Sequence, residues 1–109
     1  ATSRPFLLYD LEKEAATSIL EIPLHVMDTT LQHPKYLGLS PRVAMEKINS
    51  LAGECHKYNG VFSLLWHNNY FSDLKYPGWG QVYEDFISEH YESFQFLTGR
   101  EVYQKWGGI

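Results

Sequence analysis

Residues 59–69 read Asn-Gly-Val-Phe-Ser-Leu-Leu-Trp-His-Asn-Asn, and this stretch carries the main signal for the fold. Asn59-Gly60 readily adopts the left-handed backbone that ends a helix. Residues 61–66 form a mostly apolar run of strand length, which ends at three polar residues that begin with His67. The stretch therefore predicts a helix that stops near residue 59, followed at once by a buried strand with polar side chains at its carboxyl end.

The helix expected upstream covers residues 41–58. Ser40 can cap its first turn, and Pro41 suits the first helical position. Apolar side chains spaced by three or four residues form one stripe along it, namely Ala44, Ile48, Leu51, Cys55 and Tyr58. Cys55 is the single cysteine of the chain, so no internal disulfide can form, and its place in the stripe predicts a small buried core residue.

A second strand is predicted over residues 20–27, where apolar and polar residues alternate with the period of a half-buried strand. The apolar positions are Leu20, Ile22, Leu24 and Val26. Pro23 cannot donate a hydrogen bond to a neighbouring strand, which indicates an edge position or a bulge. Strand, helix and strand over residues 20–66 form a crossover unit, and such a unit makes its two strands parallel.

Further elements flank this unit. Residues 5–9 are short, apolar and aromatic and predict a strand, whereas residues 10–16 fit a helical turn capped by Asp10. A broad apolar face predicts a second long helix over residues 79–97, with a last short helix over 100–106. The predicted fold class is α/β, and residues 1–109 form a single domain. The architecture expected is a partial (β/α) barrel-like unit with parallel strands over residues 5–9, 20–27 and 61–66 and helices over 41–58 and 79–97.

The composition narrows the classes of function. The chain has 109 residues, enough for one domain and too few for two separate cores. Its formal net charge is −4 and its nine Lys and Arg residues are scattered, so no basic stripe indicates binding of nucleic acid. No apolar run approaches the roughly 18 residues of a membrane-spanning helix. Aromatic residues make up 16% of the chain, but they serve cores and sugar-binding surfaces alike.

Two polar residues follow the strands of the crossover unit. Asp28 comes directly after residues 20–27, and His67 comes directly after residues 61–66. Parallel strands end at the same edge and neighbours lie about 4.8 Å apart, so the two side chains can reach hydrogen-bond distance. A carboxylate beside an imidazole suits general acid catalysis. The alternative is structural, because Asp is a common turn residue and a histidine there can simply bond a backbone carbonyl.

At this point the sequence resembles a known family. Leu64-Leu65-Trp66-His67-Asn68 is similar to the last motif of polysaccharide deacetylases of the NodB-homology type, carbohydrate esterases in which Leu-x-His ends a strand of a distorted (β/α) barrel. Upstream, Arg4-Pro5-Phe6, Ile22-Pro23-Leu24 and Val26-Met27-Asp28-Thr29-Thr30-Leu31 resemble the matching region of a bacterial branch, in the same order. The resemblance implies the C-terminal part of a larger domain that hydrolyses N- or O-acetyl groups on a polysaccharide or oligosaccharide.

The resemblance also implies roles for single residues. His67 corresponds to the general acid that protonates the leaving group, and Asp28 corresponds to the carboxylate that orients this histidine. Leu65 corresponds to a wall of the acetyl pocket, and Arg4 to the arginine that braces the catalytic base.

Three aromatic residues near His67 are further candidates for contact with the sugar. Trp66 lies inside the motif, while Tyr70 and Phe71 follow in the next loop and can stack on pyranose rings. The alternative for this loop is structural, with its aromatic rings covering the end of the barrel.

The family uses a divalent metal such as zinc to activate water. Its ligands come from an early motif with paired aspartates and a later motif with two histidines. This sequence has no Asp-Asp pair and no His-x-x-x-His, and its five histidines show no recognised ligand spacing. We therefore predict no metal site in this chain and no deacetylation by the chain alone.

Two other classes of function stay open. A non-catalytic carbohydrate-binding module on the same scaffold would use His67 only to hydrogen-bond a ligand, and a protein-interaction module would use the aromatic loop. A partial barrel exposes strand edges, so we expect either a homo-oligomer or association with the missing N-terminal half of the domain. The sugar and the cellular compartment are left open.

Overall fold

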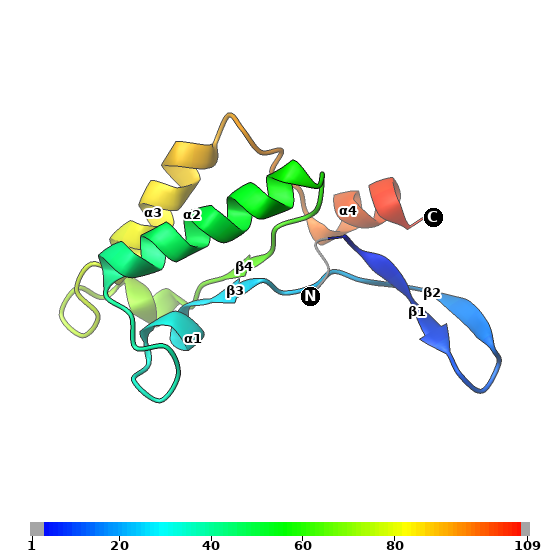
Figure 1. The fold of residues 1–109 in the computed structure, drawn as a ribbon, viewed down its shortest axis with the longest axis horizontal. Helices are drawn as coiled ribbons and strands as arrows, with labels where there is room; N and C mark the ends of the chain where they lie inside the picture. Colours follow the sequence, from blue (N-terminus) through cyan, green and yellow to red (C-terminus); the bar gives the residue numbers. More distant parts are fainter. Residues whose placement is uncertain (1–3, 108–109) are drawn as a thin grey trace.

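The computed structural model describes residues 4–107. In chain order its elements are β1 (Phe6–Asp10), β2 (Ala15–Glu21), β3 (Val26–Met27), α1 (Asp28–Gln32), α2 (Pro41–Lys57), β4 (Leu64–Leu65), the 3-10 helix η1 (Asn68–Phe71), α3 (Trp79–His90) and α4 (Gly99–Trp106). Figure 1 shows α1, α2 and α3 gathered around β3 and β4, with the β1–β2 hairpin extending away from them. No helix in the described part of the chain is long and apolar enough to cross a membrane.

The predicted barrel-like unit with three parallel strands is wrong. The structure has two separate two-stranded sheets, of which β1–β2 is antiparallel and β3–β4 is parallel. The predicted strand over residues 5–9 corresponds to β1, but it pairs with residues that follow it directly, from Asp10 opposite Ala15 to Phe6 opposite Glu21. The fold is therefore a small mixed α/β arrangement.

The expected helical turn over residues 10–16 is also wrong, because the chain reverses there. Oδ1 of Asp10 accepts the backbone N–H groups of Glu12 and Lys13 at 2.9 and 3.2 Å. Glu14 then takes a left-handed backbone with φ 51°. These local bonds and the positive φ produce a tight connection that returns the chain along β1.

The crossover unit is present, but its strands are much shorter than predicted. β3 and β4 run parallel, with Val26 opposite Leu64, and α2 connects them. The segment 20–27 is divided because its first residues complete β2 in the hairpin and Pro23 lies in the connection that follows. The segment 61–66 gains a partner strand only late, beginning where the Ser63 carbonyl accepts the N–H groups of His25 and Val26 at 3.0 and 3.2 Å.

The helix predicted over residues 41–58 is confirmed as α2. Ser40 caps it, since its Oγ accepts the Val43 N–H at 3.3 Å. Asn59 beyond its end has the expected left-handed backbone, with φ 53°.

The second long helix was predicted over residues 79–97, but α3 stops at His90. The N–H groups of Ser93 and Phe94 both bond the carbonyl of His90, which closes the helix with a turn. This turn brings the ring of Phe94 to 5.4 Å from the ring of His90. The short C-terminal helix is confirmed as α4, and a capping box between Thr98 and Glu101 starts it.

The hydrophobic core lies between α2, α3 and the β3–β4 pair. Its buried residues are Val26, Leu31, Ala44, Ile48, Ala52, Tyr70, Trp79, Val82 and Phe86. Cys55 is buried in the same stripe of α2, as predicted. The core therefore holds β3 and β4 side by side beneath α2 and fixes the edge at which both strands end.

Candidate functional site

The candidate site lies where β3 and β4 end. Asp28 is the first residue of α1 and follows β3 directly, and His67 lies two residues beyond the end of β4. Because Met27 is opposite Leu65 in the parallel pair, both polar residues leave the sheet at the same edge. The topology thus brings together two residues that are 39 positions apart.

Asp28 is fully buried, and both oxygens of its carboxylate are hydrogen-bonded, one to Thr29 and His67 and the other to His67. Oδ1 lies 2.8 Å from Nδ1 of His67, which we assign as the donor because a carboxylate oxygen accepts; the same oxygen accepts the Thr29 N–H at 2.7 Å and lies 3.3 Å from the Thr29 hydroxyl. Oδ2 accepts the backbone N–H of His67. A buried carboxylate is costly unless its oxygens are hydrogen-bonded, so this set of donors explains how Asp28 is accommodated.

His67 presents the accessible half of the pair. Its side chain is 49% exposed, whereas that of Asp28 is not exposed at all. With Nδ1–H directed at the carboxylate, the neutral imidazole carries its lone pair on Nε2. A ring held in this tautomer can accept a proton on Nε2 or, once protonated, donate it to a bound molecule.

A second layer of hydrogen bonds supports Asp28 from η1. The hydroxyl of Tyr70 lies 3.2 Å from Oγ1 of Thr29 and 3.4 Å from Oε1 of Gln32. Tyr70 is only 4% exposed, and its ring stacks on Tyr76 at a centroid distance of 4.2 Å. In this structure Tyr70 therefore connects η1 to α1, and its buried ring is not presented for stacking on a sugar.

Sequence reasoning missed Thr29 and Gln32 as members of this network. The sequence gives only a partial indication of this network, since Thr29 follows Asp28 directly and Tyr70 comes three residues after His67. The network depends on η1 folding back over α1, which no periodicity in the sequence indicates.

The other candidates near His67 differ in exposure. Leu65 is 41% exposed and Phe71 is also 41% exposed. The ring of Trp66 is partly buried between Trp79 and Tyr83, at centroid distances of 6.1 and 6.0 Å. Its indole Nε1 is buried, with no hydrogen-bond partner in the described residues. Leu65 and Phe71 are thus partly accessible, although the ring of Phe71 also contacts that of Tyr83 at a centroid distance of 5.5 Å, whereas Trp66 packs against α3.

Arg4 is not brought to this site. Its Nη2 donates to the carbonyl oxygen of Tyr58 at 3.3 Å, just beyond the C-terminal end of α2. α1 lies near the other end of that helix (Figure 1), where the Leu39 N–H bonds the Leu31 carbonyl. Since α2 has 17 residues, its two ends are about 25 Å apart.

The zinc implied by the resemblance does not fit the described residues. Within residues 4–107 no group of three or more His, Cys, Asp or Glu side chains could hold a metal ion. Other histidines are engaged elsewhere: Nδ1 of His25 accepts the Ser63 N–H at 3.3 Å, and Nε2 of His90 lies 2.8 Å from Oδ1 of Asn49. We therefore assign no metal ligand to this part of the chain.

No protein-family model matches the chain, and the comparisons with curated proteins and with solved structures found no match either.

Proposed function

We propose that Asp28 and His67 form the proton-transferring pair of a carbohydrate deacetylase, with this chain supplying the C-terminal part of the catalytic domain. The observation that supports the proposal is the contact between a fully buried carboxylate and a half-exposed imidazole. A general acid must be accessible to its substrate and held in one orientation, and a half-exposed ring bonded to a buried carboxylate meets both requirements.

In this proposal His67 acts on the leaving group. After the oxygen of water has bonded to the acetyl carbon, the bond between that carbon and the sugar nitrogen or oxygen breaks, which releases acetate and leaves the bonding electron pair on the leaving atom. Protonated His67 gives its Nε2 proton to that atom and becomes neutral, while Asp28 holds Nδ1–H and keeps the ring in place. Leu65 and Phe71 are partly exposed and lie within four residues of His67 in the chain, and in this proposal they contact the acetyl group and the sugar.

The resemblance assigns water activation to a metal and a base. Residues 4–107 offer no ligand set for that metal, so we assign no step in this chain to it. The acid and its orienting carboxylate are the parts that this chain contributes.

The proposal is tested by measuring acetate release from oligomers of N-acetylglucosamine and from acetylated xylan with the product of the complete gene. We expect His67→Gln to lower the rate by about 10²- to 10⁴-fold, the usual contribution of a general acid. His33→Gln is the matched control, because the His33 side chain is exposed and its Nδ1 accepts the neighbouring Lys35 backbone N–H at 3.0 Å. Full activity in His67→Gln would refute the proposal.

Two other outcomes would redirect it. Binding of acetylated oligosaccharides without acetate release, weakened by His67→Ala, would indicate a carbohydrate-binding module. Binding of a protein partner that is independent of sugar and survives His67→Ala would indicate an interaction module.

A further inference from the structure

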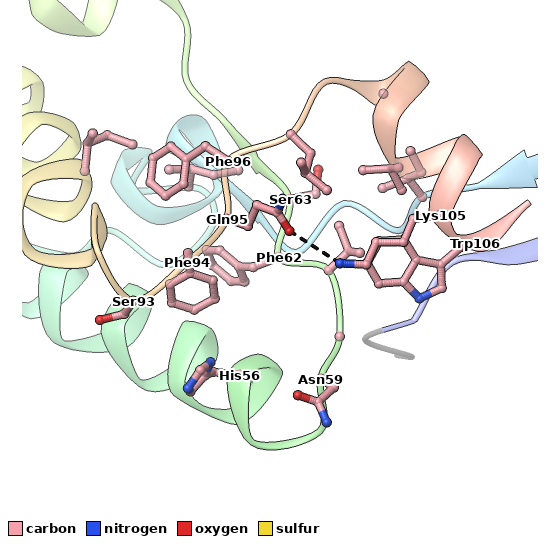
Figure 2. A pocket seen from close by; sticks show the side chains of 18 of the residues that line it. His56, Asn59, Phe62, Ser63, Ser93, Phe94, Gln95, Phe96, Lys105 and Trp106 are labelled. Atoms are coloured by element: carbon pink, nitrogen blue, oxygen red, sulfur yellow. Dashed lines mark hydrogen bonds between the residues drawn. The ribbon is translucent and has the colours of Figure 1, made fainter.

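A cavity of about 730 Å³ lies apart from the Asp28–His67 pair. It opens between the segment that leads into β4, the middle of α3, residues 93–97 and α4 (Figure 2). Asp28, Thr29, His67 and Tyr70 do not line it. Its volume falls within the range of roughly 300–1,000 Å³ that is typical of small-molecule pockets.

Apolar side chains form most of the cavity wall. They come from four segments distant in the sequence, and include Ile22, Val61, Phe62, Phe94, Phe96 and Trp106. Figure 2 shows the rings of Phe62, Phe94 and Phe96 on one side, with Trp106 on the other. Walls of this kind gain free energy by burying an extended apolar body, at about 25 cal/mol per Å² of apolar surface removed from water.

The charge of the lining is opposite to that of the chain. The chain has 13 acidic residues against nine basic ones, yet none of the residues that line the cavity is Asp or Glu. Lys105 carries the one fixed charge among those lining residues. An anion is therefore favoured in the cavity, although the chain as a whole repels anions.

Lys105 is placed to receive that anion. Its Nζ lies 3.3 Å from Oε1 of Gln95 and 5.3 Å from the centre of the Trp106 ring (Figure 2). Gln95 and Trp106, the two neighbours of this ammonium group, are both neutral. Among the described residues, Lys105 forms no ion pair with a carboxylate. The amide nitrogen of Gln95 can add a second donor beside it.

We propose that this cavity binds a small organic carboxylate with an extended apolar body, such as a medium-chain fatty acid. The carboxylate bonds Nζ of Lys105 and the amide of Gln95, and the hydrocarbon chain lies along Phe62, Phe94 and Phe96. The proposal is independent of the Asp28–His67 pair, so either one can fail without the other.

The test is a titration of the ¹⁵N-labelled chain with decanoate, and in parallel with decanol as a neutral analogue. We expect saturable shifts of backbone signals from residues 59–64 and 93–106 and of the Trp106 indole N–H, which is assigned with Trp106→Phe. Decanoate should bind about tenfold more tightly than decanol, because an ammonium–carboxylate hydrogen bond contributes roughly a tenfold change in affinity.

Lys105→Met, which removes the charge and shortens the unbranched side chain by one atom, should remove the difference between decanoate and decanol, and Lys105→Arg should retain it. Lys75→Met is the matched control, because Lys75 also lies over an aromatic ring, Tyr76 at 5.6 Å, but outside the cavity. Equal affinities for decanoate and decanol in the wild-type chain, or unchanged decanoate binding in Lys105→Met, would overturn the assignment of the charge. Shifts centred on Asp28 and His67 or on the hairpin would overturn the site itself.

Discussion

Nδ1 of His67 lies 2.8 Å from Oδ1 of Asp28, across 39 positions of sequence. The contact forms because β3 and β4 run parallel and end at one edge of their sheet. The two side chains differ in their exposure to solvent, because the carboxylate is fully buried while the imidazole is 49% exposed. The carboxylate can set the orientation and tautomer of the ring, and the ring can exchange a proton with a bound molecule.

We predict that the neutral form of His67 carries its proton on Nδ1, and that Asp28→Asn disturbs this preference. The amide that replaces the carboxylate can direct an N–H group at Nδ1, which favours the other tautomer. Two-bond ¹H–¹⁵N spectra of the ring distinguish the tautomers directly. Asp85→Asn, which alters an exposed carboxylate of α3, is the control and should leave the His67 signals unchanged. An unprotonated Nδ1 in the wild-type chain would contradict the orientation described above.

Tyr70→Phe should lower the free energy of unfolding by about 1 kcal/mol, the typical net contribution of one hydrogen bond. The ring would keep its stacking on Tyr76, so the loss isolates the hydroxyl that lies 3.2 Å from Oγ1 of Thr29. Urea denaturation followed by circular dichroism provides the measurement. Tyr91→Phe removes a hydroxyl from a ring that is 72% exposed and should be neutral. Equal changes in the free energy of unfolding for the two substitutions would show that the Tyr70 hydroxyl does not stabilise the hydrogen-bond network around Asp28.

Burial raises the pKa of the Cys55 thiol, because desolvation disfavours the thiolate. The folded-state pKa then lies above the unfolded one, so this contribution to stability is present below about pH 8.5 and is lost as the pH rises past that value. We expect iodoacetamide at pH 8 to alkylate Cys55 at least about tenfold more slowly in the native chain than in urea. Between pH 7 and pH 9.5 the wild-type chain should also lose more stability than Cys55→Ala. Equal alkylation rates in the native and unfolded chains would show that the thiol is accessible.

The β1–β2 hairpin leads us to expect self-association at high concentration. A two-stranded hairpin is only marginally stable by itself in water, and this one exposes Leu8 by 37% and Ile19 by 59%. Light scattering over a range of concentrations should show a mass above that of the monomer. Leu8→Thr combined with Ile19→Thr should shift the equilibrium toward the monomer. The double substitution removes exposed apolar surface, and threonine is compatible with both β-strands. Leu74→Thr, at a side chain that is 98% exposed in a loop, is the control, and a wild-type chain that stays monomeric throughout would contradict the prediction.

Local signals predicted the parts of the fold that depend on neighbouring residues. α2 follows from its capping residues and its stripe of apolar side chains, and Cys55 is buried where that stripe places it. The proximity of Asp28 and His67 was also predictable, because it needs only one crossover unit and the rule that parallel strands end together. Their chemical roles remain a proposal.

The hairpin and the end of α3 were not predictable in the same way. Asp10 is compatible with both a helix N-terminus and a tight turn. The turn forms because β1 pairs with residues 15–21. Likewise the apolar pattern of α3 continues beyond His90, but the turn at Ser93 and Phe94 ends the helix.

The amino-acid sequence by itself determined the long helix, the parallel crossover and the edge at which Asp28 and His67 meet, because these depend on periodicity, capping and chain direction. Only the tertiary structure decided that Tyr70 turns inward to support Thr29, that Arg4 lies at the far end of α2, and that Lys105 faces an apolar cavity. The physical reason is that these positions result from competition among many weak packing contacts between segments distant in the chain, which no single stretch of sequence records.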